Sequence, residues 1–123
     1  MHRIGAIIYI LWGILHLLGA ANGFRLAGEV DPGLIQGKLF QHAWNTGLFG
    51  AFGIVVAVLL NWKNSRTGYW LNLLVLGVTD LGYVVFVVLP GYISPIEGWS
   101  GPILWALAAV FSTLGMREKA VKS

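Results

Sequence analysis

The chain contains no cysteine, and charged residues make up only 11% of its 123 positions. Without cysteine it can form neither disulfides nor thiolate metal sites, and it has no thiol nucleophile. Soluble domains carry about a quarter charged residues, so a charge content this low excludes an ordinary soluble protein. Apolar residues are abundant instead, with 57% of the positions hydrophobic. The composition therefore indicates an integral membrane protein.

Four apolar segments each approach the ~20 residues that cross a hydrocarbon core about 30 Å thick. We predict transmembrane helices over residues 4–21, 41–60, 67–89 and 98–115. The first segment also resembles a secretory signal, with His2 and Arg3 before its apolar run. However, a signal core does not need the polar His16 that this segment contains. The predicted fold class is all-α, with residues 1–123 forming one domain of four transmembrane helices.

Basic residues are distributed unevenly between the two ends of the predicted helices. Six of the eight lie at one end: Arg3, Lys63, Arg66, Arg117, Lys119 and Lys122. Because cytoplasmic segments carry an excess of Lys and Arg, this bias predicts that both termini are cytoplasmic. The placement also accounts for the net charge of +3, so the charge does not indicate a nucleic-acid partner. The expected surroundings are a lipid bilayer.

The longest predicted connection covers residues 22–40, on the outer side of the membrane. Within it, Asp31 and Pro32 have the form of an N-cap followed by a first helical residue. A short helix is expected from residue 32, which either runs into the second transmembrane helix or lies at the interface. In the last outer connection, Pro90 and Pro95 are expected to end the third helix and hold the chain extended.

Ionisable residues inside transmembrane helices are costly and usually face the bundle interior with a partner. Asp80 lies about 19 Å above the inner end of the third helix, and His16 about 18 Å above the inner end of the first. The two therefore share a depth. On the second helix, Asn45 lies at a similar height, with His42 a turn above it. We predict a polar cluster in the outer half of the bundle, made by His16, Asn45, Asp80 and Tyr83 with His42 near its mouth.

Several functions remain open for this cluster. A purely structural His16–Asp80 pair would fix the register of the first and third helices. A pocket open to the outer leaflet would bind a small hydrophobic or amphipathic molecule, such as a lipid or quinone. Its expected ligand-binding residues are Trp12, His16, His42, Asn45, Asp80 and Tyr83.

An enzyme is also possible, because a buried His and carboxylate can act as an acid/base pair. Asp80 and His16 would then be the candidate catalytic residues of an isomerase- or hydrolase-like reaction on a lipophilic substrate. A third alternative is a subunit of an oligomeric transporter or channel. No cofactor is required: His16 and His42 differ in depth by about 9 Å, which disfavours haem, and a metal site would need Glu29 or Glu97 to fold in.

Small residues are expected to bring the helices close together, since no hydrophobic force drives helix association within lipid. Gly50 and Gly53 serve this purpose on the second helix. The fourth helix has no ionisable group within its predicted span, and we interpret it as a packing or oligomer-forming helix. Its small-residue face consists of Gly101, Trp105, Ala108, Ser112 and Gly115.

The segment YILWGILHLL, residues 9–18, places His16 four positions after Trp12 in the first predicted helix. It resembles the first helix of small bacterial four-helix membrane proteins of the DoxX-like kind and of neighbouring uncharacterised families. Overall length, the glycine-bearing second helix and the short basic turn agree with this resemblance. DoxX-like proteins commonly carry an acid in the second helix, whereas this chain has Asp80 in the third. The resemblance implies a bacterial inner-membrane protein that serves as an accessory subunit in membrane redox or quinone chemistry.

Overall fold

The four apolar segments fold as four long helical spans, and the structure contains no strand. The computed structural model describes all residues from 1 to 123. The first two spans are α1 (His2–Gly28) and α2 (Leu34–Leu59), and the last is α5 (Pro95–Lys122). The third span joins four shorter elements end to end: α3 (Arg66–Leu71), η2 (Asn72–Leu76), α4 (Gly77–Tyr83) and η3 (Val84–Val88). All four spans are long and apolar enough to cross a membrane, so the predicted fold class is confirmed.

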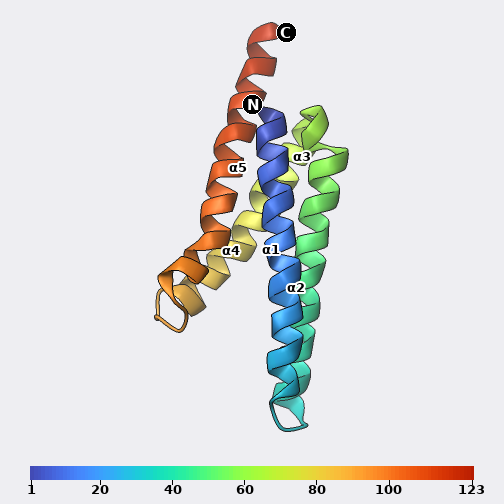
Figure 1. Cartoon of the computed structure of the whole chain (residues 1–123). Helices are drawn as coiled ribbons and strands as arrows, with labels where there is room; N and C mark the ends of the chain where they lie inside the picture. The colour runs from blue at the N-terminus through green and yellow to red at the C-terminus, as the bar shows by residue number, and fades with distance from the viewer.

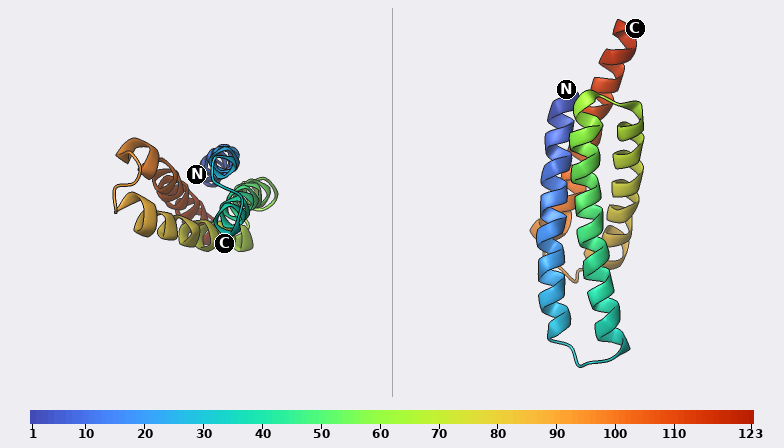
Figure 2. Two further views of the ribbon diagram at one scale, coloured as in Figure 1. Left: turned by 90° about the horizontal axis from the view of Figure 1, so that it is seen from below. Right: turned by 90° about the vertical axis from the view of Figure 1, so that its right-hand side faces the viewer.

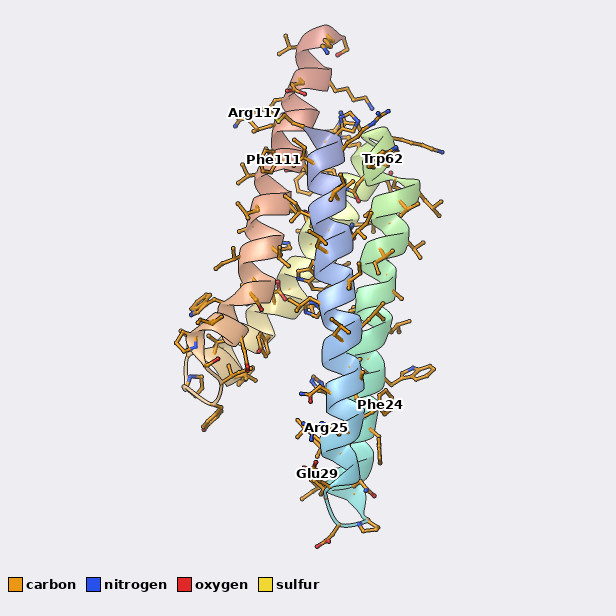
Figure 3. All side chains as sticks on the ribbon, viewed as in Figure 1. Phe24, Arg25, Glu29, Trp62, Phe111 and Arg117 are labelled. Atoms are coloured by element: carbon orange, nitrogen blue, oxygen red, sulfur yellow. The ribbon has the colours of Figure 1, made fainter.

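Successive spans run antiparallel, so both termini lie at the same end of the bundle (Figure 1). We call this the basic end, because the six basic residues that the sequence analysis assigned to one side of the membrane all lie there. They are in the ends of the helices or in the turn between α2 and α3. Trp62, Phe111 and Arg117 lie toward it, whereas Arg25 and Glu29 lie toward the opposite end (Figure 3). Around the bundle, α1 packs against α2 and α5, and the third span runs between α2 and α5 on the other side (Figure 2).

The exterior of the bundle is largely apolar. Only 23 of the 123 residues are buried, and the exposed ones include many large hydrophobic side chains. Leu18 is 64% exposed, Val78 68% and Phe86 73%. Hydrocarbon is the solvent that suits such a surface, and helices satisfy their own backbone hydrogen bonds within it. The surface and the composition therefore indicate the same environment.

Glycines allow the helices to approach closely. A Cβ atom built on Gly50 of α2 would lie 2.7 Å from the carbonyl oxygen of Gly13 on α1. A Cβ on Gly5 would lie 2.5 Å from Ser112 Oγ of α5. In lipid, such close backbone approach supplies the packing that holds helices together. The expectation that Gly50 serves tight packing is confirmed by this contact.

Both helices of the first hairpin are longer than predicted. α1 continues to Gly28 rather than ending at residue 21, and α2 begins at Leu34 rather than at residue 41. The predicted connection over 22–40 is therefore too long, since only residues 29–33 separate the helices. The helix expected from residue 32 begins at Leu34 and runs into the second transmembrane helix, as one of the two alternatives had it, but its N-cap is Gly33 rather than Asp31. The prediction counted only the most apolar turns, whereas both helices continue through turns that mix charged and apolar residues. One such turn contains Arg25 and Glu29, which form an ion pair of 2.8 Å.

The last helix is also longer than its apolar segment. α5 begins at Pro95, where the Ser94 hydroxyl accepts a hydrogen bond of 3.4 Å from the Glu97 backbone N–H. It continues past residue 115 to Lys122, through a charged segment that hydropathy does not detect. The prediction of 98–115 therefore covers only the apolar part of this helix.

The third span, Arg66–Val88, agrees with its prediction to within one residue at each end. It is not a uniform α-helix, because the π-helical segments η2 and η3 flank α4 on both sides. Each π-helical turn inserts an extra residue and changes the direction of the side chains that follow, and such turns are frequent at functional sites. α4 carries Asp80 between them.

A buried amide connects the third span to α2 and to the turn at the basic end. Asn72 is fully buried, and its side-chain nitrogen donates to Asn61 Oδ1 at 2.9 Å and to the Gly53 carbonyl at 3.2 Å. The amide nitrogen is paired within the protein, whereas the amide oxygen is buried without a partner. Because the paired nitrogen links three parts of the chain, we interpret the contact as structural.

We expect Asn72→Leu to lower the free energy of unfolding by about 0.5–2 kcal/mol, because it leaves the buried Asn61 oxygen without its donor. Unfolding in mixed micelles titrated with a denaturing detergent measures the loss. Asn45→Leu is the matched control, since Asn45 is exposed on α2. Equal losses for the two variants would contradict a structural role for Asn72.

Candidate functional site

The buried carboxylate of Asp80 is held by the indole of Trp12. Trp12 Nε1 donates to Asp80 Oδ2 at 2.9 Å, across the interface between α1 and α4. Both residues are buried: Trp12 is fully inaccessible and Asp80 is 4% exposed. A hydrogen bond to a charged acceptor is among the stronger ones in proteins. The bond therefore fixes the direction in which the second carboxylate oxygen points.

His16 completes the site from one turn further along α1. Its ring stacks on Trp12 with the ring centroids 3.6 Å apart and an angle of 21° between the planes. His16 Nδ1 lies 2.8 Å from the backbone carbonyl oxygen of Trp12. This spacing of four residues places both side chains on one face of the helix. The ring is thus held on two sides, and its Nε2 atom faces Asp80.

Asp80 Oδ1 is the unusual atom of the site. His16 Nε2 lies 3.5 Å from it, and the oxygen is buried without any hydrogen-bond partner. No lysine or arginine forms an ion pair with Asp80. Because most buried polar atoms in folded proteins are hydrogen-bonded, an unpaired carboxylate oxygen inside a transmembrane span requires an explanation.

Gly101 of α5 packs closely against this oxygen and the His16 ring. A Cβ atom at Gly101 would lie 3.3 Å from His16 Cε1 and 3.7 Å from Asp80 Oδ1. The His16 side chain itself keeps 15% of its surface exposed. Toward the end opposite the termini, the α1–α2 hairpin and the hairpin that contains α4 and α5 move apart (Figure 1). The site therefore lies close to the point where the two hairpins separate.

The structure brings together Trp12, His16 and Asp80 of the six predicted site residues. The predicted four-residue cluster is not formed, because Asn45 and His42 are exposed on α2. Buried Ala43 faces α1, and Asn45 lies about 200° around the helix from it, at 3.6 residues per turn. Tyr83 is half-buried on the third span.

Two further residues lie near the site, and from the sequence we predicted only a role in helix packing for them. Gly101 lies beside Asp80 and His16, and Trp105 Nε1 donates to the Leu73 carbonyl of the third span at 3.1 Å. Both lie on the small-residue face of the fourth helix. That pattern was the only feature of the sequence that could have linked them to the site. No group of three or more His, Asp or Glu side chains is placed to hold a metal ion.

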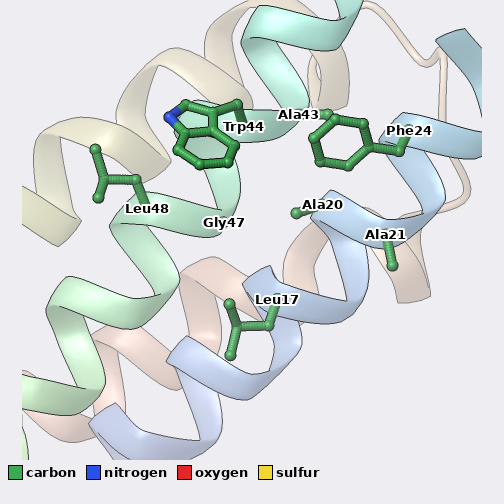
Figure 4. Close-up of a pocket in the computed structure, with 8 residues that line it drawn as sticks. All are labelled: Leu17, Ala20, Ala21, Phe24, Ala43, Trp44, Gly47 and Leu48. Atoms are coloured by element: carbon green, nitrogen blue, oxygen red, sulfur yellow. The ribbon is translucent and has the colours of Figure 1, made fainter.

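A separate hollow lies between α1 and α2 and is apolar (Figure 4). It has a volume of about 420 Å³. The residues that line it are Leu17, Ala20, Ala21 and Phe24 of α1 and Ala43, Trp44, Gly47 and Leu48 of α2. None of the six predicted site residues is among them. The hollow suits a hydrocarbon chain rather than a polar head group, and we distinguish it from the Trp12–His16–Asp80 site.

Comparisons with protein-family models, with curated proteins and with solved structures found no match to this chain.

Proposed function

We propose that this chain is a small integral membrane protein that binds a small hydrophobic or amphipathic molecule, of lipid or quinone type, at Trp12, His16 and Asp80. One observation carries the proposal: Asp80 Oδ1 is buried, lies within a membrane-spanning segment and has no hydrogen-bond partner. A polar atom of a ligand would supply that partner, and the ligand's apolar part would remain in the bilayer.

A pair with only a structural role fits the contacts less well. Buried charged pairs are stable only when good geometry and further hydrogen bonds satisfy both partners. Here Oδ2 is satisfied by Trp12, but Oδ1 and His16 Nε2 are 3.5 Å apart. Gly101 is the α5 residue that packs against this oxygen, and it offers no side-chain group to pair with it. A ligand group that reaches Oδ1 when the helices move apart would supply the missing partner.

The cellular setting is part of the same proposal. The six basic residues at the basic end support a cytoplasmic location for both termini. The resemblance of residues 9–18 to DoxX-like proteins supports a bacterial inner-membrane protein that is an accessory subunit of a redox system. In that setting the site lies in the outer half of the membrane.

The proposal is tested by identifying the small molecules that remain with the protein after gentle purification. We expect extraction and mass spectrometry to find a lipophilic molecule in stoichiometric amount with the wild-type chain. Asp80→Asn and His16→Ala are each expected to reduce its occupancy by about tenfold, the loss of one hydrogen bond to a charged group.

Matched controls separate the site from general effects of charge or of losing a histidine. Asp31→Asn changes an exposed acid, and His42→Ala removes a histidine from the exposed face of α2. Both should retain the ligand. If Asp80→Asn and His16→Ala keep every bound molecule and only lower the melting temperature, the pair is structural and the proposal is wrong. Turnover of the bound molecule that Asp80→Asn abolishes would instead favour the enzyme.

A further inference from the structure

We propose that the basic end carries a second binding site, separate from the one at Asp80, which takes the anionic phosphate head group of a lipid. The site is a polar hollow between the start of α1, the turn at Asn64 and the last turns of α5. It has a volume of about 320 Å³, and no hydrophobic residue lines it. Its two lysines are Lys119 and Lys122 of α5.

Positive charge at the basic end is almost unopposed within the protein. The six basic side chains named above share this end with a single acid, Glu118, which also lines the hollow. Glu118 Oε2 lies 3.8 Å from the N-terminal amine, so it pairs with the start of the chain. None of the six basic side chains forms an ion pair within the protein. The negative charge that balances them must therefore come from outside the protein.

The two lysines project from one face of α5. Residues three apart in an α-helix are neighbours on its surface, so both ammonium groups reach the same hollow. Lys119 Nζ donates to the backbone carbonyl oxygen of Asn64 at 3.1 Å, which holds this ammonium at the hollow. An ammonium has three N–H donors, so two remain for an anion. Lys122, one turn further along, keeps its charge unpaired.

Contacts between distant parts of the chain hold the walls of the hollow together. Asn64 adopts a left-handed backbone conformation with φ of 56°, and its side-chain nitrogen donates to the Gly115 carbonyl oxygen of α5 at 2.9 Å. His2 of α1 packs against the same glycine, where a Cβ atom would lie 2.6 Å from His2 Cβ. The hollow is thus shaped by three segments that meet at Gly115, and not by the end of α5 alone.

The hollow lies at the depth of the lipid head groups. The apolar part of α5 ends at residue 115, and the helix continues to Lys122, about 10 Å further at 1.5 Å per residue. These last turns project beyond the start of α1 (Figures 1 and 2). The head-group region on each side of the hydrocarbon core is about 5–7 Å thick. The lysines therefore lie where a lipid carries its phosphate, and basic pockets between helices at this level bind anionic head groups.

The experiment measures, by native mass spectrometry, the affinity of the full chain for the first lipid that it retains. The probes are dioleoyl phosphatidylglycerol, which is anionic, and dioleoyl phosphatidylcholine, which has the same acyl chains and no net charge. Each lysine near a membrane surface contributes about fivefold to the affinity for an anionic lipid. We expect the wild-type chain to prefer phosphatidylglycerol by about 25-fold, and Lys119→Gln combined with Lys122→Gln to lose this preference.

Lys63→Gln combined with Arg66→Gln is the matched control, because it removes two charges from the same end at residues that do not line the hollow. It should lower the affinity for phosphatidylglycerol less than the lysine variant does. Lys119→Arg with Lys122→Arg keeps both charges and should keep the preference. Lys122→Gln alone should lower the affinity about fivefold, and it serves as the test if the double variant fails to fold.

Three results would overturn the inference. Equal losses for the two glutamine pairs would show a diffuse attraction of the whole basic end in place of a site. Equal retention of the two lipids by the wild-type chain would show that no anionic head group is required. A rise in melting temperature with inorganic phosphate in phosphatidylcholine nanodiscs, without a preference for phosphatidylglycerol, would assign the hollow to free phosphate. Asp80→Asn should keep the bound phosphatidylglycerol, so this inference and the proposed function fail separately.

Discussion

Gly50→Ala is expected to lower the free energy of unfolding by about 3 kcal/mol, the upper part of the usual range for overpacking. The added methyl group would lie 2.7 Å from the Gly13 carbonyl oxygen and 3.2 Å from the Leu17 backbone nitrogen. Neither atom belongs to a flexible side chain, so α1 and α2 must separate along their contact. The same methyl group would lie 3.1 Å from His16 Cβ, and we therefore expect ligand occupancy to fall as well.

Gly19→Ala is the control for this substitution. It makes the same chemical change on α1, but a Cβ atom at Gly19 has nothing within 4 Å. It should leave stability unchanged or raise it slightly, because alanine favours helix over glycine by up to about 1 kcal/mol. Detergent-induced unfolding followed by circular dichroism compares the two variants. A Gly50→Ala protein as stable as Gly19→Ala would show that the α1–α2 contact is looser than the structure has it.

Trp12→Phe is expected to lower the free energy of unfolding by about 1.5–3 kcal/mol, because it removes the only hydrogen-bond donor to a buried carboxylate. The phenyl ring keeps most of the apolar contact, so the loss reports on the indole N–H. Trp44→Phe is the control, since Trp44 is 67% exposed and should tolerate the change.

A double-mutant cycle separates the hydrogen bond from the packing of the indole ring. In the background of Asp80→Leu there is no carboxylate to leave unpaired, so Trp12→Phe should cost less than about 1 kcal/mol. A coupling energy near zero between the two positions would contradict the Trp12–Asp80 bond as a stabilising contact. The same cycle measured on ligand occupancy tests whether Trp12 orients Asp80 for binding.

Much of the fold was predictable from the chain because lipid imposes a simple rule. A span needs about 20 apolar residues, so hydropathy finds the number of helices, and the third one to within a residue at each end. The same rule underestimated the first hairpin by seven residues in α1 and by seven in α2. Those turns mix charged residues, such as Arg25 and Lys38, with apolar ones, and hydropathy does not separate such a helical turn from a loop.

The candidate site was predictable in depth but not in direction. The rise per residue places His16 and Asp80 at one height, and the structure brings His16 Nε2 to 3.5 Å from Asp80 Oδ1. Asn45 shares nearly the same height, yet it is exposed. Height along an axis follows from counting residues, whereas the direction of a side chain depends on the rotation of its helix, which the sequence does not state.

By itself, then, the sequence determined the apolar environment, the four helices and the level at which a histidine and an acid meet. Only the tertiary structure decided that Trp12 is the donor to Asp80, that α2 turns Asn45 and His42 outward, and that Gly101 lies beside the unpaired oxygen. The physical reason is that glycine contacts such as Gly13–Gly50 set the rotation of each helix. Those contacts depend on close packing between distant parts of the chain, and close packing arises only when all four helices are together.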